Sequence, residues 1–340
     1  MKKSVKFGIF ADLHVDIMHD TEARLKEFLA AAKRENVDFI IQLGDFCYPD
    51  EDRKCICQPE KRPENIVVAL EHPTYADKES IRRMYRDFDV PSYHVIGNHD
   101  CDMCSKRQIL DYYSADYEPY YSFDVGGFHF IVLDPNYYKK DGEYVSYENG
   151  NYFDESYHKV RVLPYLPPQQ LDWLKKELDS TDKPSVIFSN QSLCENTDGA
   201  ILNAAEFHEA IKNRRSRVVA SFNGHSHIDS KRKIDGVWYM HINSMSNYWL
   251  GEPYTTLCRY DKETDEKYPN VRYVAPYTNP VYAIIELDEC GARIKGTEGE
   301  FVGKTPAELG FYEKNDGIRL MKMGESPVSP GIEDCYLSFE

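Results

Sequence analysis

The feature that most constrains this chain is an apolar run that ends directly in residues able to bind metal ions or move protons. Residues 92–96 are rich in β-branched and aromatic side chains, and Gly97-Asn98-His99-Asp100 follow at once. The run predicts a buried strand, and the glycine permits a sharp turn at its end. Side chains delivered in this way lie at the carboxyl edge of a sheet, where open α/β folds bind ligands.

The same construction recurs along the chain. Apolar runs at residues 5–11, 37–43, 185–189 and 218–222 lead into Asp12 and His14, into Asp45, into Asn190, and into His225 and His227, respectively. Helical patterns separate the runs, at about residues 21–32, 81–88, 168–178 and 203–212. In the last of these, Asn203 and Glu206 resemble a capping box. Continuous apolar runs suit strands that are covered on both faces, so we expect one α/β domain with two sheets.

A long polar segment, residues 135–168, interrupts this alternation and is rich in tyrosine. Loops of this length inside a compact domain are usually functional or disordered. Its tyrosines could wall a pocket and stack a nucleobase, or the segment could pack on itself, which we favour. The series comprises Tyr137, Tyr138, Tyr144, Tyr147, Tyr152 and Tyr157.

Charge and hydropathy limit the kinds of partner that this chain can bind. The 340 residues carry a formal net charge of -16, which repels the phosphates of a nucleic acid polymer. A small phosphorylated substrate is compatible with this charge, because bound cations can reverse its sign within a cleft. No apolar stretch approaches the length of a membrane span, so we expect no membrane association. The oligomeric state stays open.

The nine cysteines predict free thiols in a reducing compartment, and therefore a soluble, cytoplasmic protein. A second interpretation is a zinc site built from Cys55, Cys57, Cys101 and Cys104. Only the pair Cys101 and Cys104 has the two-residue gap that is usual in such sites, so we favour free thiols.

Asp-x-His and His-x-His at loop tips are ordinary arrangements of metal ligands. Carboxylates combined with imidazoles suit Mn, Fe or Zn. Two ions about 3.5–4 Å apart need a bridging carboxylate, and such a pair can clamp both oxygens of a phosphoryl displacement.

Taken in order, Asp-x-His, Gly-Asp, Gly-Asn-His-Asp and Gly-His-x-His resemble the calcineurin-like metallophosphoesterase family. The resemblance implies a four-layer αββα sandwich of two mixed sheets flanked by helices, spanning residues 1–300, with residues 301–340 as a C-terminal extension packed on the same domain. It implies two metal ions, the first held by Asp12, His14, Asp45 and His227. Asp45 would bridge to the second, which would take Asn98, His225 and a further ligand.

The resemblance also implies a mechanism. A metal-bound hydroxide would attack phosphorus, and His99 would hold the phosphate or protonate the leaving oxygen. Asp100 is placed by sequence to orient His99. Asn190 departs from the family pattern, which usually offers histidine there. An amide oxygen is a harder and weaker ligand than imidazole, so we expect a second site that favours Mn or Mg over Zn, or a weak one.

The leading function is a metal-dependent phosphodiesterase acting on cyclic nucleotides or other small phosphodiesters. A phosphomonoesterase is the alternative within the same family. A non-catalytic metal-binding scaffold is the alternative from another class. Asn243, Ser244 and Asn247 follow a strand close to the histidine loop, and we considered them as further contacts to substrate.

Overall fold

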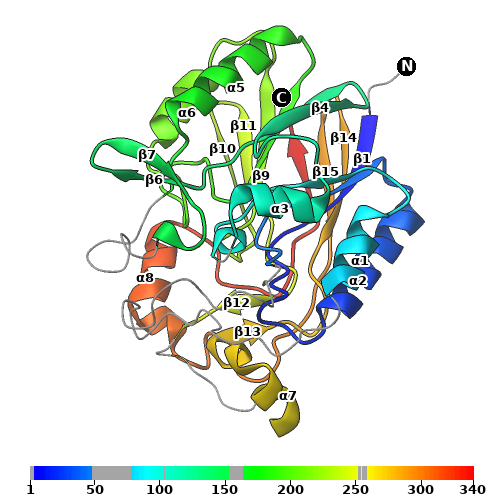
Figure 1. Ribbon diagram of the computed structural model, residues 1–340, viewed down its shortest axis with the longest axis vertical. Coiled ribbons are helices and arrows are strands. Elements are labelled where there is room, and N and C mark those ends of the chain that lie inside the picture. Colours follow the sequence, from blue (N-terminus) through cyan, green and yellow to red (C-terminus); the bar gives the residue numbers. More distant parts are fainter. Residues whose placement is uncertain (1–3, 48–77, 103, 153–163, 252–253, 255–258) are drawn as a thin grey trace.

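The computed structural model describes residues 4–47, 78–102, 104–152, 164–251, 254 and 259–340. Two six-stranded sheets face each other, and helices cover their outer faces (Figure 1). α1 (Thr21–Glu35) and α2 (Lys78–Arg86) lie outside one sheet, and α5 (Pro168–Ser180) and α6 (Ala204–Ile211) lie outside the other. This is the four-layer sandwich of two mixed sheets that we predicted.

The first sheet has the order β16-β15-β14-β1-β2-β3, and the second has the order β10-β11-β9-β8-β5-β4. The strands of the first are β1 (Ser4–Phe10), β2 (Phe39–Gln42), β3 (Ser92–His94), β14 (Ala283–Asp288), β15 (Gly291–Gly296) and β16 (Cys335–Ser338). Those of the second are β4 (Tyr121–Val125), β5 (Phe128–Val132), β8 (Ser185–Ser189), β9 (Val218–Asn223), β10 (Ser230–Ile234) and β11 (Val237–His241). β1, β2 and β3 run parallel, as do β5, β8, β9 and β11, while the remaining pairs are antiparallel.

The smaller elements lie between these strands in the sequence. They are α3 (Lys106–Tyr113), α7 (Lys262–Lys267), α8 (Asn315–Lys322), the short helices η2 (His99–Cys101), η4 (Pro269–Tyr273) and η5 (Phe311–Glu313), and the two-stranded ribbons β6 (Tyr137–Lys140) with β7 (Glu143–Ser146) and β12 (Asn247–Trp249) with β13 (Val274–Pro276).

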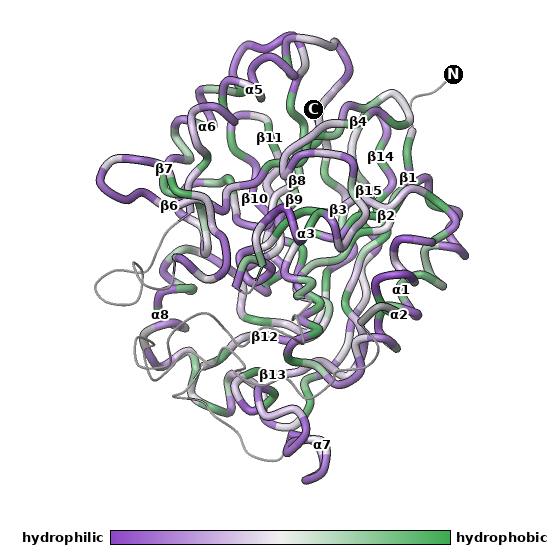
Figure 2. The backbone as a smooth tube through the Cα atoms, in the orientation of Figure 1, coloured by the Kyte–Doolittle hydropathy of each residue, from purple (hydrophilic) through white to green (hydrophobic). Residues whose placement is uncertain are grey.

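The central strands are apolar on both faces because each face packs on a different layer. In β1, Phe7 and Ile9 enter the core between the sheets, while Phe10 packs under α1. In β8, Phe188 faces the other sheet and Ile187 faces α5 and α6. Figure 2 shows the same division, with hydrophobic strands inside and more hydrophilic helices outside. The continuous apolar runs of the sequence follow from this two-sided burial.

The C-terminal residues contribute a strand that the sequence did not predict. β16 pairs with β15 at the edge of the first sheet, and Leu337 is buried in the core between the sheets. α8 also packs inward through Leu320. β16 therefore belongs to the same sheet as β1, the first strand of the chain. The division into a domain and a C-terminal extension at residue 300 stays a prediction.

The tyrosine-rich segment contains a hairpin, β6–β7, that we did not predict. Tyr138, Tyr147 and Tyr152 are buried in one cluster, where the rings of Tyr147 and Tyr152 stack with centroids 4.3 Å apart. These tyrosines therefore pack on one another and on apolar side chains of α3, such as Ile109 and Leu110, rather than presenting a flat wall to solvent. Tyr157 lies outside the described residues.

Two helix starts differ in their capping. The start of α3 has the full capping box, with Ser105 and Gln108 exchanging hydrogen bonds. At α6, Asn203 is the N-cap residue and its Nδ2 donates to Glu206 Oε2 at 3.1 Å, as the predicted helix start requires. The capping box itself was wrong, because the Asn203 amide binds the backbone N–H and C=O of Leu166, at 3.0 and 2.8 Å, and makes no bond to the first turn's backbone N–H groups.

The zinc site is not tested, since Cys55 and Cys57 fall outside the described residues. Cys101 is a buried free thiol. Within the described part of the chain, the helices are too short or too polar to cross a bilayer.

Candidate metal centre

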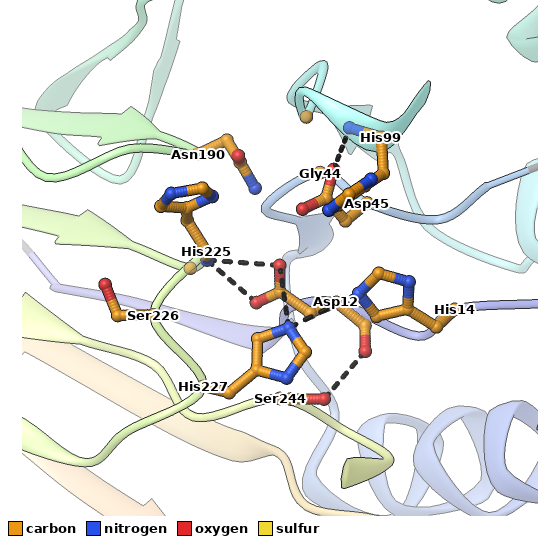
Figure 3. A network of polar contacts seen from close by, with 12 residues as sticks. Asp12, His14, Gly44, Asp45, His99, Asn190, His225, Ser226, His227 and Ser244 are labelled. Atoms are coloured by element: carbon orange, nitrogen blue, oxygen red, sulfur yellow. Dashed lines mark hydrogen bonds and ion pairs between the residues drawn. The ribbon is translucent and has the colours of Figure 1, made fainter. Parts of the chain in front are cut away.

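Five parallel strands bring the predicted ligands to one rim of the sandwich. Asp12, Asp45 and Asn98 follow β1, β2 and β3 of one sheet, and Asn190 and His225 follow β8 and β9 of the other. Hydrogen bonds join the two sets: the Asn190 amide Nδ2 donates to the Leu43 carbonyl at 2.9 Å, and the His225 backbone N–H donates to both oxygens of Asp12 at 2.9 and 3.1 Å. Figure 3 shows the side chains of Asp12, Asp45, His14, His227, Asn190 and His225 gathered around a common space.

Two glycines permit this convergence. A Cβ on Gly97 would lie 2.1 Å from Asp45 Oδ1, and one on Gly224 would lie 2.7 Å from Asp12 Oδ2. Neither distance is compatible with a side chain. The backbone itself therefore forms part of the wall against which the two carboxylates rest.

Most of the predicted ligands have an unusual backbone conformation. Asp12, His14, Asp45, His225 and His227 all lie in the left-handed region, with φ between 51° and 67°. This region is unfavourable for residues other than glycine, and such residues gather at functional sites when the surrounding structure holds them there. The conformation turns each side chain towards the rim directly after its strand.

Asp12, His14 and His227 form a group whose ligand atoms lie within 4.8 Å of one another. His227 Nδ1 donates to the Asn247 carbonyl at 2.7 Å, and His14 Nδ1 lies 3.1 Å from Asp16 Oδ1. With both Nδ1 protons engaged, the two Nε2 atoms direct their lone pairs at each other across 3.3 Å. A cation bound by both Nε2 atoms would remove the repulsion between the two lone pairs.

Electrostatics favour a cation at the same place. Burial and the neighbouring Asp45 carboxylate raise the pKa of Asp12 well above its ordinary value. Burial, and then His14, hold the pKa of His227 well below its ordinary value, so its imidazole is neutral and able to ligate. Buried carboxylates and neutral imidazoles around one space are the surroundings that a metal ion stabilises.

Asn98 and Asn190 have side-chain oxygen atoms that are available to a second ion. Their side-chain Oδ1 atoms are buried and have no hydrogen-bond partner among the described residues. Because the Asn190 Nδ2 is held by Leu43, its Oδ1 is the atom left for a ligand. Orphaned buried acceptors are costly, and a bound cation would satisfy both. The residues present therefore fit a second ion with a preference for oxygen.

The comparison with known proteins agrees with this geometry. The sequence profile of the calcineurin-like phosphoesterase family matches residues 5–229, which span every predicted ligand. The chain belongs to the calcineurin-like phosphoesterase family. It is therefore a hydrolase of phosphoric esters, in a family whose members depend on a dinuclear metal centre.

Solved structures are similar in fold. A dimetal phosphatase from Danio rerio has a TM-score of 0.58 at 16% identity, covering 89% of this chain and 99% of its own. GAP50, the anchor in the inner membrane complex of Plasmodium, gives 0.43 at 13% identity, with 98% of each chain covered. A putative 5'-nucleotidase from Staphylococcus aureus gives 0.44 at 10% identity, with 94% of this chain and 58% of its own covered. No curated protein sequence matches this phosphoesterase.

His99 lies at the exposed side of the centre, with 42% of its side chain accessible. Its backbone N–H donates to Asp45 Oδ1 at 2.8 Å, and its ring centroid lies 5.6 Å from that of His14. The ring Nδ1 lies 2.9 Å from Asp102 Oδ2. Although desolvation acts in the opposite direction, the carboxylate of Asp102 raises the pKa of His99 to about 10.

The prediction that Asp100 orients His99 was wrong. Asp100 accepts three backbone N–H groups instead, from Asp45 at 3.0 Å, Cys47 at 2.7 Å and Gly97 at 2.8 Å. The short helix η2 explains the difference, because it places the residue three positions after His99 beneath the imidazole. Asp100 therefore joins the loops that follow β2 and β3.

Sequence reasoning missed several residues that support the centre. Asp16 and Asp102 contact the histidine rings, Tyr152 donates its hydroxyl to Asp102 Oδ1 and lies 3.2 Å from the Asn98 carbonyl, and Asn247 accepts from His227. Of the residues considered as substrate contacts, Ser244 instead donates to the Asp12 carbonyl. The spacing Asp-x-His-x-Asp was the one available signal, since it brings Asp16 near His14.

Proposed function

We propose that this phosphoesterase hydrolyses small phosphodiesters at a dinuclear metal centre on the rim of the sandwich. Asp12, His14, Asp45 and His227 would hold the first ion. Asp45, Asn98, Asn190 and His225 would hold the second. The observation that carries the proposal is the pair of imidazole Nε2 atoms that face each other at 3.3 Å, together with the buried, unpartnered oxygens of Asn98 and Asn190 among the described residues.

The donor atoms differ between the two halves, and so should the ions. The first half offers two imidazoles with carboxylates, which suit Fe, Zn or Mn. The second half has amide oxygens at Asn98 and Asn190, which suit the harder Mn or Mg. A mixed or Mn-loaded centre is therefore our expectation for the active protein.

When bound, the two ions supply Lewis-acid polarisation of the phosphoryl oxygens and lower the pKa of a water nucleophile. His99 stands beside this position with its Nδ1 held by Asp102, so Nε2 is the nitrogen that can reach the substrate. It would bind a phosphate oxygen or give its proton to the leaving oxygen. Asp45 accepts the backbone N–H of His99 and so fixes the distance between the acid and the metal ligands.

The narrower expectation of a cyclic nucleotide stays a prediction. The proposed stacking wall loses support, because Tyr138, Tyr147 and Tyr152 pack on one another. Cytoplasmic location also stays a prediction, supported by buried free thiols such as Cys101 and Cys194.

The test compares bis-p-nitrophenyl phosphate, p-nitrophenyl phosphate and cyclic AMP as substrates, with Mn, with Zn and after chelation. We expect Mn-dependent turnover of the diester that Asp45→Asn abolishes and Asp172→Asn, on the exposed face of α5, retains. Turnover of the monoester alone would assign a phosphomonoesterase instead. If neither ester is hydrolysed with any metal, the chain is a metal-binding scaffold and the proposal is wrong.

A further inference from the structure

A cavity adjoins the proposed metal centre on the side of His225. Its volume is about 390 Å³, towards the small end of ligand pockets in proteins. The loop between β8 and α6 forms one wall, and Arg319 of α8 and Met323 directly after it, both from the C-terminal extension, contribute to another. Because His225 belongs both to this wall and to the proposed ligand set, the cavity begins beside the proposed centre.

The described wall is mainly aliphatic. Pro164, Ala200, Ile201, Leu202 and Met323 line it, and His225 supplies the aromatic ring among the described residues that do so. Nucleobases are usually held by stacking on aromatic rings, which this wall offers only at His225, a residue of the proposed ligand set. Aliphatic side chains favour an apolar group through the area that it removes from water.

The charges on the wall do not favour an anionic group. The cation among the described lining residues, Arg319, donates to the carboxylate of Asp198, and Asp198 is buried. The Asp198 backbone carbonyl in turn accepts the Ser226 hydroxyl at 2.8 Å, which ties the pair to the histidine loop. Glu195 also lines the cavity and adds negative charge, so a second anionic group would be repelled.

We infer that this cavity is the subsite for one ester group of the substrate, and that it takes an uncharged aliphatic group. The inference rests on the proposed function, since a phosphodiester held at the metals can direct an ester group past His225. It narrows the substrate class from small phosphodiesters in general to alkyl diesters. It also gives the C-terminal extension a function, because α8 supplies part of the wall.

The test uses alkyl p-nitrophenyl phosphates, in which the leaving group is constant and the alkyl group grows from methyl to butyl. With the Mn-loaded protein we expect kcat/KM to rise by about fourfold for each methylene that becomes buried, the ratio that about 0.8 kcal/mol gives. The rise should end when the chain outgrows the cavity.

Two variants connect the effect to this cavity. Ala200→Phe fills it and should bring the butyl-to-methyl ratio of kcat/KM towards one, while Met323→Ala enlarges it and should move the optimum to a longer chain. Ala30→Phe is the matched control, because Ala30 is exposed on α1, on the opposite side of the molecule (Figure 1). Its ratio should equal that of the unmodified protein. Thermal unfolding would show which variants are folded.

The outcomes separate this inference from the proposed function. Equal kcat/KM for methyl and butyl esters would overturn the subsite and leave the phosphodiesterase intact. Higher kcat/KM for thymidine 5'-p-nitrophenyl phosphate or p-nitrophenylphosphorylcholine than for the butyl ester would also overturn it, in favour of a nucleoside or a cationic group. No turnover of even the methyl ester, with any metal, would overturn both.

Discussion

Replacing Asp102 by Asn tests the contact between His99 and Asp102 directly. The substitution keeps the size of the side chain and can retain a hydrogen bond to His99 Nδ1, but it removes the negative charge 2.9 Å away. If His99 protonates the leaving oxygen, the loss of this charge lowers its pKa from about 10 towards the ordinary value, so a smaller fraction of the imidazole carries a proton at pH 8 and the ring is less well oriented. We therefore expect a lower kcat and little change in KM.

The size of the effect follows from the contact. A hydrogen bond to a charged group contributes about 1.5–3 kcal/mol and a neutral one about 0.5–1.5 kcal/mol, so the difference is about 1–2 kcal/mol. That range corresponds to a fall in kcat of about 5- to 30-fold. Because 42% of the His99 side chain is accessible, water weakens the interaction and places the expectation near fivefold.

The assay compares two diesters, methyl phenyl phosphate and methyl p-nitrophenyl phosphate. Phenolate is a strong base that needs a proton as it leaves, whereas p-nitrophenolate leaves without one. Asp102→Asn should therefore slow the phenyl ester about fivefold and the p-nitrophenyl ester much less. An equal loss on both esters would refute general acid catalysis through this pair.

Asp100→Asn is the matched control, because Asp100 has the same side chain two residues earlier but accepts backbone N–H groups. The amide nitrogen would face donors from Asp45, Cys47 or Gly97, which should lower the free energy of unfolding by about 1–3 kcal/mol. Its effect on kcat should not depend on the leaving group. A selective loss on the phenyl ester in this variant would restore Asp100 as the partner of His99.

Three further predictions concern stability and metal binding. Burial lowers the pKa of His94 to about 3 from its usual 6.5, so below pH 6.5 the unfolded chain binds a proton that the folded chain excludes, and stability falls. The loss at pH 5 is about 2 kcal/mol. Urea unfolding should show that the free energy of unfolding differs less between pH 7.5 and pH 5 in His94→Gln than in the unmodified protein, by that amount. An equal difference in the two proteins would contradict this. Asn190→His should shift metal content from Mn towards Zn in elemental analysis, and an unchanged ratio would exclude Asn190 as a ligand. Gly224→Ala should weaken metal binding by about tenfold or more in a titration, because its Cβ would press on Asp12; unchanged affinity would place the metal elsewhere.

The sequence predicted the central strands and the polar residues that follow each of them, because those signals are local. An apolar run and the Asp, Asn or His that follows it are neighbours in the chain, and burial on both faces makes the run continuous. This was enough to place Asp12, Asp45, Asn98, Asn190 and His225 at one rim. Which of them bind metal stays a prediction.

The parts that were missed depend on contacts between distant or differently oriented residues. Asn203 binds the backbone of Leu166, 37 positions away, so its local capping pattern was overridden. Asp102 rather than Asp100 contacts His99, because one turn of η2 places the residue three positions after His99 next to its imidazole. The sequence alone does not show that this turn forms. β16 is a short edge strand that follows several prolines and glycines in the sequence. Its partner β15 lies about 40 residues earlier in the chain, so no local signal shows the pairing.

The left-handed backbone at Asp12, His14, Asp45, His225 and His227 has a consequence for how this protein can change. Glycine adopts this backbone conformation at a lower cost than Asp or His, by at most about 1–2 kcal/mol at each position. Selection for thermostability alone would therefore favour glycine in place of these residues. A laboratory lineage that is evolved only to resist heat should lose its metal ligands before it loses its core.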